Sequence, residues 1–192
     1  MSPLAKLYAW VAEERLAGNR FSHGAVLGTI DKFEQPHTRM LGVHFDKNYC
    51  PRFHTSPTSR KVVDLTHNQQ ASLTFAFQTS LRSVSLEGCL VALSAQQLDN
   101  DWLKLESSFR RSYMIFGNAS GTVLESADVL ENALANLPVE AELVRPAGFM
   151  GYQFATITRI AFYSVSTKAF AEHEVWTFEP ASKKWSQQFL IP

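Results

Sequence analysis

The stretch that decides the fold is His54-Thr55-Ser56-Pro57-Thr58-Ser59-Arg60-Lys61. It ends the apolar and aromatic run 50–56, which is typical of a strand, and it opens the helical segment 57–68. Hydroxyl groups, free helix N–H groups and two adjacent cations meet there, an arrangement that favours an anion such as a phosphate. Without an anion the two cations are unfavourable, because the helix dipole already places positive charge at that end. The alternative is that Arg60 and Lys61 are solvated helix residues.

The chain around this stretch is locally basic. Residues 32–61 contain six basic and two acidic side chains, whereas residues 112–144 contain five acidic side chains and no Lys or Arg. Over the whole chain 18 Lys and Arg balance 18 Asp and Glu. One basic segment in a neutral protein indicates a local anion site rather than a charged face for a polymer, unless the charges cluster by chance. Arg39, on a preceding strand, is expected to approach the same anion from the neighbouring β layer.

Composition excludes several classes of protein. With 192 residues, 45% of them apolar, the chain can form one ordinary core, and we expect a single domain over residues 1–192. Its neutral charge argues against a nucleic-acid binder or a polybasic membrane adaptor. No apolar run reaches the roughly 18 residues of a membrane span, and charged residues 13–15 stand where a signal peptide would be cleaved. The only cysteines, Cys50 and Cys89, are expected to be buried thiols, and a cytoplasmic location is expected.

Hydrophobic periodicity predicts more strand than helix. Helices are predicted over 3–17, 57–68, 96–110 and 127–137. Strands are predicted over 22–30, 37–45, 50–56, 71–77, 82–94, 153–165, 173–179 and 185–191. Ser56 is the expected N-cap of the second helix, with Pro57 in its first turn, and Ser126 is the expected N-cap of the last. This order predicts an α+β domain, mainly β, around a closed antiparallel sheet.

The common catalytic motifs are absent from the sequence. There is no Gly-x-Ser-x-Gly elbow, and Cys50 precedes Pro51 in a predicted strand, a poor place for an activated thiolate. The six histidines show no His-x-x-x-His spacing, so no metal site is predicted. Neither Gly-x-Gly-x-x-Gly nor a Walker loop is present, which excludes the common nucleotide-binding folds.

The order of motifs is more informative. A strand with Arg-x-x-x-x-(Lys/His), a turn, a second strand ending in Thr, and then Ser-Arg-Lys and a helix resembles the pyridoxamine 5′-phosphate oxidase-like FMN-binding split-barrel family. The spacing holds without gaps from Arg39 to Lys61, and the likeness returns at 160–163 and in the Trp-x-x-x-x-Leu-x-Pro ending of 185–192. The resemblance implies an antiparallel split β-barrel with flanking helices. It also implies FMN as cofactor, bound at the interface of a homodimer.

Position by position, the resemblance implies a set of cofactor contacts. They are Arg39, His44, His54, Thr55, Ser59, Arg60, Lys61, Ser83 and Tyr163. Arg39, Arg60 and Lys61 match the contacts to the phosphate and ribityl chain. Ser83 stands where the oxidases have Gln, and Tyr163 replaces a Trp beside the flavin ring, an exchange that preserves stacking.

Departures from the oxidase pattern fall on the substrate side. His44 replaces a Lys that touches flavin and substrate, and His54 replaces a Tyr. The oxidases' Arg-x-His-Asp-Arg segment keeps its histidine as His173, but Ala171 and Val175 replace both arginines. The residues left for substrate are Arg110, Arg111, Ser112 and His173. His173 is the candidate catalytic residue, with a purely structural role as the alternative.

Two functions from different classes follow from these residues. The first is an FMN-dependent oxidoreductase that acts on a small molecule other than pyridoxine phosphate, with the flavin carrying the electrons. The second is a flavin or tetrapyrrole binding module without turnover, because a fold alone does not fix a function.

Overall fold

The molecule is a curled antiparallel sheet flanked by helices, and its computed structural model describes residues 1–138, 142–165 and 170–192. The strands are β1 (Gly24–Ile30), β2 (Pro36–Gly42), β3 (His44–Phe45), β4 (Pro51–Thr55), β5 (Gln70–Phe77), β6 (Arg82–Ala92), β7 (Met150–Ser164), β8 (Glu172–Glu179) and β9 (Lys184–Leu190). Their hydrogen-bonded order is β2-β1-β5-β6-β7-β4-β3, with β8 beside β7 and β9 beside β8.

The predicted fold class, an α+β, mainly β, antiparallel split barrel with flanking helices, is confirmed. The expectation of a closed sheet is wrong for the described residues, because the end strands β2 and β3 do not pair with each other. The predicted strand 37–45 divides at Val43, which leaves β3 only two residues long. Such a short strand adds little pairing to the sheet edge.

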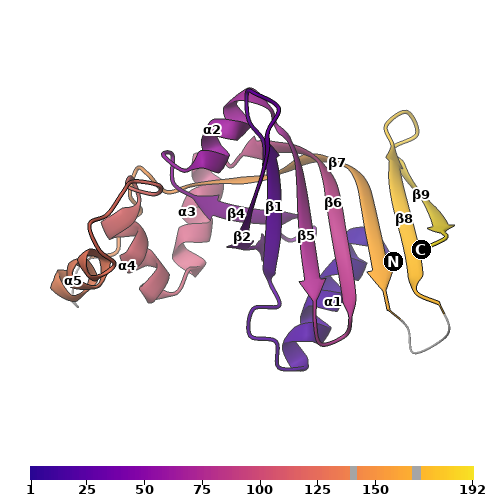
Figure 1. The fold of residues 1–192 in the computed structure, drawn as a ribbon, viewed down its shortest axis with the longest axis horizontal. Helices are drawn as coiled ribbons and strands as arrows, with labels where there is room; N and C mark the ends of the chain where they lie inside the picture. The colour runs from indigo at the N-terminus through magenta and orange to yellow at the C-terminus, as the bar shows by residue number, and fades with distance from the viewer. Residues whose placement is uncertain (139–141, 166–169) are drawn as a thin grey trace.

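The helices are α1 (Pro3–Leu16), α2 (Arg60–His67), α3 (Ala95–Lys104), α4 (Ser107–Phe116) and α5 (Asp128–Asn136). In Figure 1, α3, α4 and α5 lie beyond one side of the sheet, and the β8–β9 hairpin lies at the other. No helix in the described ranges is long and apolar enough to cross a membrane.

The start of α2 differs from the sequence-based expectation. Ser59, not Ser56, is the N-cap, and Pro57 lies in the turn before the helix. The backbone N–H of Ser59 donates to the carbonyl oxygen of Ser56 at 3.1 Å, which closes that turn and delays the helix. Arg60 and Lys61 are therefore the first two helical residues, whose backbone N–H groups have no acceptor within the helix.

The expected helix 96–110 is two helices. Leu105 adopts an extended conformation, and its buried side chain packs in a small cluster with Trp102 and Phe149. The chain therefore turns at Leu105 and Glu106 before α4 begins. The last helix, α5, begins after Ala127 without a side-chain cap, so the prediction of Ser126 as its N-cap is also wrong.

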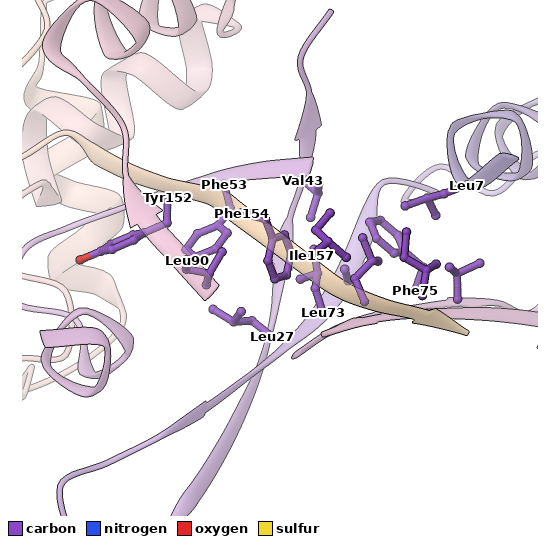
Figure 2. Close-up of a cluster of buried hydrophobic side chains, with 14 of the residues drawn as sticks. Leu7, Leu27, Val43, Phe53, Leu73, Phe75, Leu90, Tyr152, Phe154 and Ile157 are labelled. Carbon is purple, nitrogen blue, oxygen red and sulfur yellow. The ribbon is translucent and has the colours of Figure 1, made fainter. Parts of the chain in front are cut away.

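The main core lies inside the curl of the sheet. Leu27, Phe53, Phe75 and Ile157 belong to it, together with Leu7 of α1 (Figure 2). At Gly88 of β6 the pairing with β7 shifts register, and a Cβ there would lie 2.0 Å from the carbonyl oxygen of Thr156. Only glycine allows the two backbones to approach so closely, and the resulting bulge helps the sheet to bend.

Candidate functional site

The start of α2 and strand β2 form a basic hollow, which we call the cradle. Its volume is about 460 Å³, and it is lined by Pro36, His37, Thr38, Arg39, Ser59, Arg60, Lys61, Ser120 and Gly121. The structure thus brings Arg39, Arg60 and Lys61 together at one place. The free N–H groups of the first turn of α2 lie at the same helix end. These groups fit a phosphate, which favours helix N-termini and charge-assisted hydrogen bonds.

A buried carboxylate holds Arg39. Asp64 of α2 accepts hydrogen bonds from Arg39 Nη2 at 3.2 Å and from Thr29 Oγ1 at 2.6 Å, and its side chain is only 2% exposed. Arg39 Nη1 also donates to Thr29 Oγ1 at 2.6 Å. Burial alone would raise the pKa of Asp64, but the hydrogen bonds from Thr29, His37 and Arg39 hold that pKa below its usual range. Asp64 therefore fixes Arg39 and offsets one of the positive charges.

The other two cations are held differently. Arg60 is exposed and bonds to His37 Nε2, while His37 Nδ1 lies 3.3 Å from Asp64 Oδ2. Lys61 is half-buried and donates to Thr55 Oγ1 at 3.0 Å, and this hydroxyl lies 2.9 Å from that of Ser59. Burial, and then the charge of Arg39, lowers the pKa of Lys61. An anion in the cradle would relieve this cost of a desolvated cation.

Beside the cradle lies a second, larger cavity of about 680 Å³, which we call the chamber. Its apolar wall consists of Phe109, Ile115, Phe116, Leu124, Val129, Leu130 and Ala133. The lining also includes polar residues from the end of β4 and the start of α2, namely His54, Thr55, Ser56 and Lys61. Lys61, Ser120 and Gly121 line both spaces, so the chamber and the cradle adjoin. A ligand with an apolar body and a phosphate arm matches this pair of spaces.

The polar end of the chamber is backed by an ion-pair cluster. Asp101 of α3 lies 3.1 Å from His54 Nε2 and accepts from Arg52 Nη1 at 3.2 Å. Burial lowers the pKa of His54 to about 4, although Asp101 opposes the shift. The His44 ring lies 5.2 Å from that of His54, and His44 lines neither space. Within the described ranges no three His, Cys, Asp or Glu side chains are arranged to hold a metal ion.

Of the residues on α4 that the sequence suggested for substrate binding, only some line the chamber. Ser112 lines the chamber with Phe109 and Tyr113, whereas Arg110 and Arg111 do not. Arg111 donates to the carbonyl oxygens of Leu137 and Pro138, so it fastens the end of α5 instead. Burial raises the pKa of Tyr113 to about 12 and keeps its hydroxyl protonated. The chamber wall formed by α4 is therefore aromatic and uncharged.

Ser83, Tyr163 and His173 form a row across β6, β7 and β8, which we call the outer row. They are directly opposite one another in the register, and the rings of Tyr163 and His173 lie 5.8 Å apart. Ser83 and Tyr163 alternate with the fully buried Val84 and Phe162, so they point away from the core.

The outer row is separated from the cradle of the same chain. Arg39 pairs with the fully buried Leu27 and shares its core-facing side of the sheet. From β2 to β6 there are three strand spacings, about 14 Å. The structure thus brings Arg39, Ser59, Arg60 and Lys61 together but leaves Ser83, Tyr163 and His173 elsewhere.

Sequence reasoning missed several residues of the site. Asp64 and Asp101 were not singled out, because a buried carboxylate on a helix face looks like any surface acid until its partners are known. Ser120 and Gly121 lie about 60 residues from the motif that they complete. The helical spacing of Phe109, Ser112, Tyr113 and Phe116 was the one available signal for an apolar wall.

Known proteins resemble this chain along nearly its whole length, although no family model matches it. The dihydrophenazinedicarboxylate synthase of Pseudomonas chlororaphis is 24% identical over 99% of this chain and 84% of the relative. The pyridoxine/pyridoxamine 5′-phosphate oxidase of Zymomonas mobilis is 25% identical over 95% of this chain and 94% of the relative.

Two solved structures show the same fold. PhzG of Burkholderia lata, solved with tetrahydrophenazine-1-carboxylic acid, has a TM-score of 0.87 at 20% identity, over 100% of this chain and 93% of its own. A pyridoxamine 5′-phosphate oxidase-related, FMN-binding protein of Nostoc punctiforme has a TM-score of 0.81 at 15% identity, over 100% and 99%. With the split barrel and the motif at residues 54–61, these likenesses confirm the resemblance. The chain resembles the pyridoxamine 5′-phosphate oxidase-like proteins over nearly its whole length and shares their split-barrel fold, as a divergent relative.

Proposed function

We propose that the protein is an FMN-dependent oxidoreductase that acts on a small molecule other than pyridoxine phosphate. The observation that carries this proposal is the basic cradle that opens, through Lys61, into the mainly apolar chamber. The phosphate of FMN would lie against Arg39, Arg60 and Lys61 and the first turn of α2. Thr55, which lines the chamber and accepts a hydrogen bond from Lys61, would contact the flavin near its ring. Bound flavin would accept two electrons from the substrate, chemistry that the side chains alone do not provide.

The proposal includes a homodimer. Within one chain, the cradle and the outer row point to different sides of the sheet, so one FMN would not contact both. A second copy would bring its Ser83, Tyr163 and His173 to the flavin held in the first cradle. Interfaces of this obligate kind bury roughly 2,000 Å² or more. Sedimentation should then show a dimer at micromolar concentration, and an FMN-loaded monomer would contradict the arrangement.

A substrate other than pyridoxine phosphate is favoured by the wall of the chamber. The α4 face is aromatic there, and Arg111 is engaged with backbone carbonyls of the α5 end. The similarity to a dihydrophenazinedicarboxylate synthase points toward ring compounds with larger apolar bodies. His173 of the partner copy is the proposed catalytic candidate, because it would reach the flavin side of such a substrate.

The test measures both halves of the reaction, reduction of the bound flavin by a donor and its reoxidation by an acceptor. FMN-loaded protein is reduced without oxygen, and its flavin absorbance is followed after mixing with oxygen or with candidate acceptors; turnover is measured with hydroaromatic donors. An oxidoreductase should be reduced by a donor faster than free FMN under the same conditions. Tight FMN binding without any such acceleration across a broad set of donors would favour the non-catalytic binding module instead.

A further inference from the structure

The His54–Asp101 pair at the polar end of the chamber has a defined hydrogen-bond polarity. Asp101 also accepts from Arg52 Nη1, at 3.3 Å to one carboxylate oxygen and 3.2 Å to the other, so it is an ionised acceptor. An ionised carboxylate has no proton to give. The 3.1 Å contact to His54 Nε2 is therefore made by an N–H of the imidazole. His54 is neutral near pH 7, because burial lowers its pKa to about 4. Its Nδ1 then carries a lone pair and no proton.

No group of the described protein donates a hydrogen bond to that lone pair. Nδ1 of His54 has no hydrogen-bond partner there, and it is not among the unpartnered atoms that are sealed from solvent. The Nε2 edge is committed to Asp101, and the ring stacks on Phe149 with 4.7 Å between centroids. The His54 side chain is only 5% exposed, and the space that it lines is the chamber. His54 thus brings a buried acceptor, without a partner in the described protein, to the lining of a cavity that is otherwise mainly apolar.

From this geometry we propose that His54 is a specificity-determining residue, which selects a planar, mainly apolar ligand that carries an N–H or O–H donor. Asp101 is the positioning residue, because it fixes the tautomer that leaves Nδ1 as the acceptor. A ligand that presents an acceptor to Nδ1 would leave two lone pairs face to face, a buried mismatch that costs affinity. The inference rests on the proposed function in taking the chamber as the substrate side of an FMN site.

The probes that test this are indole and benzofuran, which have the same shape and differ in one donor. Each is titrated by calorimetry into FMN-loaded protein and into flavin-free protein at pH 7.5. A neutral hydrogen bond corresponds to a preference of about twofold to tenfold, so wild type should bind indole about fivefold tighter. Equal binding of the two probes, or tighter binding of benzofuran, would overturn the proposal.

Two variants distinguish the acceptor of His54 from the hydroxyl groups that also line the chamber. His54→Phe keeps an aromatic ring on Phe149 but removes the acceptor, so the indole preference should vanish. His67→Phe, the same exchange at an exposed residue at the end of α2, is the matched control and should keep it. A preference that persists in His54→Phe would assign the donor's partner elsewhere and refute the role of His54.

Asp101→Asn tests the positioning role without changing the shape of the cluster. Arg52 would keep the amide oxygen, which turns the amide N–H₂ toward His54 Nε2 and moves the imidazole proton to Nδ1. The preference for indole should then fall to parity or reverse, whereas a residue that merely supports the fold would change both affinities equally. Failure of FMN to bind would remove the proposed function alone, because the indole preference is also read in flavin-free protein.

Discussion

Lys61→Ala should weaken FMN binding much more than Arg60→Ala does. Lys61 is half-buried, and among the described residues its side-chain partner is the neutral hydroxyl of Thr55, so little nearby offsets its charge. A charge-assisted hydrogen bond to phosphate in that setting is worth about 1.5–3 kcal/mol, or roughly ten- to 150-fold in affinity. Arg60 is exposed and is hydrogen-bonded to His37. Solvent therefore screens its contact with the phosphate, which is worth about 0.2–1 kcal/mol, so the affinity for FMN should fall less than roughly sixfold.

The assay is quenching of flavin fluorescence, titrated with FMN and with riboflavin. Riboflavin lacks the phosphate, so its affinity should change less than about twofold in either variant, since only a weak contact is lost. Lys47→Ala, which removes an exposed lysine outside both spaces, controls for the loss of one positive charge. Equal weakening for both flavins, or a larger loss with Arg60→Ala, would refute the assignment of Lys61 to the phosphate.

Three further outcomes are expected. Asp64→Asn should lower the free energy of unfolding by about 2–4 kcal/mol at pH 7 in urea titrations, because Thr29, His37 and Arg39 lose a charged acceptor. The pKa of Asp64 is lower in the folded protein than the unfolded value near 3.9, so its charge stabilises the fold at pH values above about 4. The penalty of Asp64→Asn should therefore shrink as the pH falls below about 4. A penalty that does not change with pH would exclude the charge as its cause. Gly88→Ala should cost about 1–3 kcal/mol through the clash with Thr156, while Gly42→Ala, with no atom nearer than 3.6 Å, should cost less, and equal costs would remove the argument from close approach. FMN-saturated protein should form pyridoxal 5′-phosphate about a hundredfold to ten-thousandfold more slowly than a true oxidase, because two charge-assisted contacts are missing at Ala171 and Val175; turnover within tenfold of that control would restore the oxidase function.

Local sequence patterns predicted most of the strands and helices but not the turns that end them. Alternation of apolar residues located the strands, since a half-buried strand imposes a period of two. The start of α2 was misplaced because Pro57 and Ser56 suit a first turn and an N-cap, yet the hydrogen bond from Ser59 to Ser56 closes a separate turn first. The break at Leu105 was missed because Leu98, Trp102, Leu105 and Phe109 keep helical spacing across it. Packing of Leu105 against Phe149, more than 40 residues away, determines the break.

The candidate site, too, was only partly predictable from the sequence. The three cations of the cradle could be proposed from one motif and one strand, because the strand–helix order fixes where they meet. The carboxylates of the site could not, since Asp64 holds Arg39 of the cradle and Asp101 holds His54 of the chamber from other elements. The outer row illustrates a further limit: strand register shows that Ser83, Tyr163 and His173 align, but only the sheet as a whole shows that they face away from the cradle.

In the arrangement that we propose, two copies of this chain hold FMN between the cradle of one and the outer row of the other. Native mass spectrometry of the purified protein after incubation with excess FMN measures the cofactor, its stoichiometry and the oligomeric state together. We expect a dimer of the 21.6 kDa chain that carries two FMN molecules, with wild type loaded fully and Lys61→Ala loaded poorly at the same FMN concentration. A monomer that carries FMN, or a dimer that stays free of flavin, would contradict it.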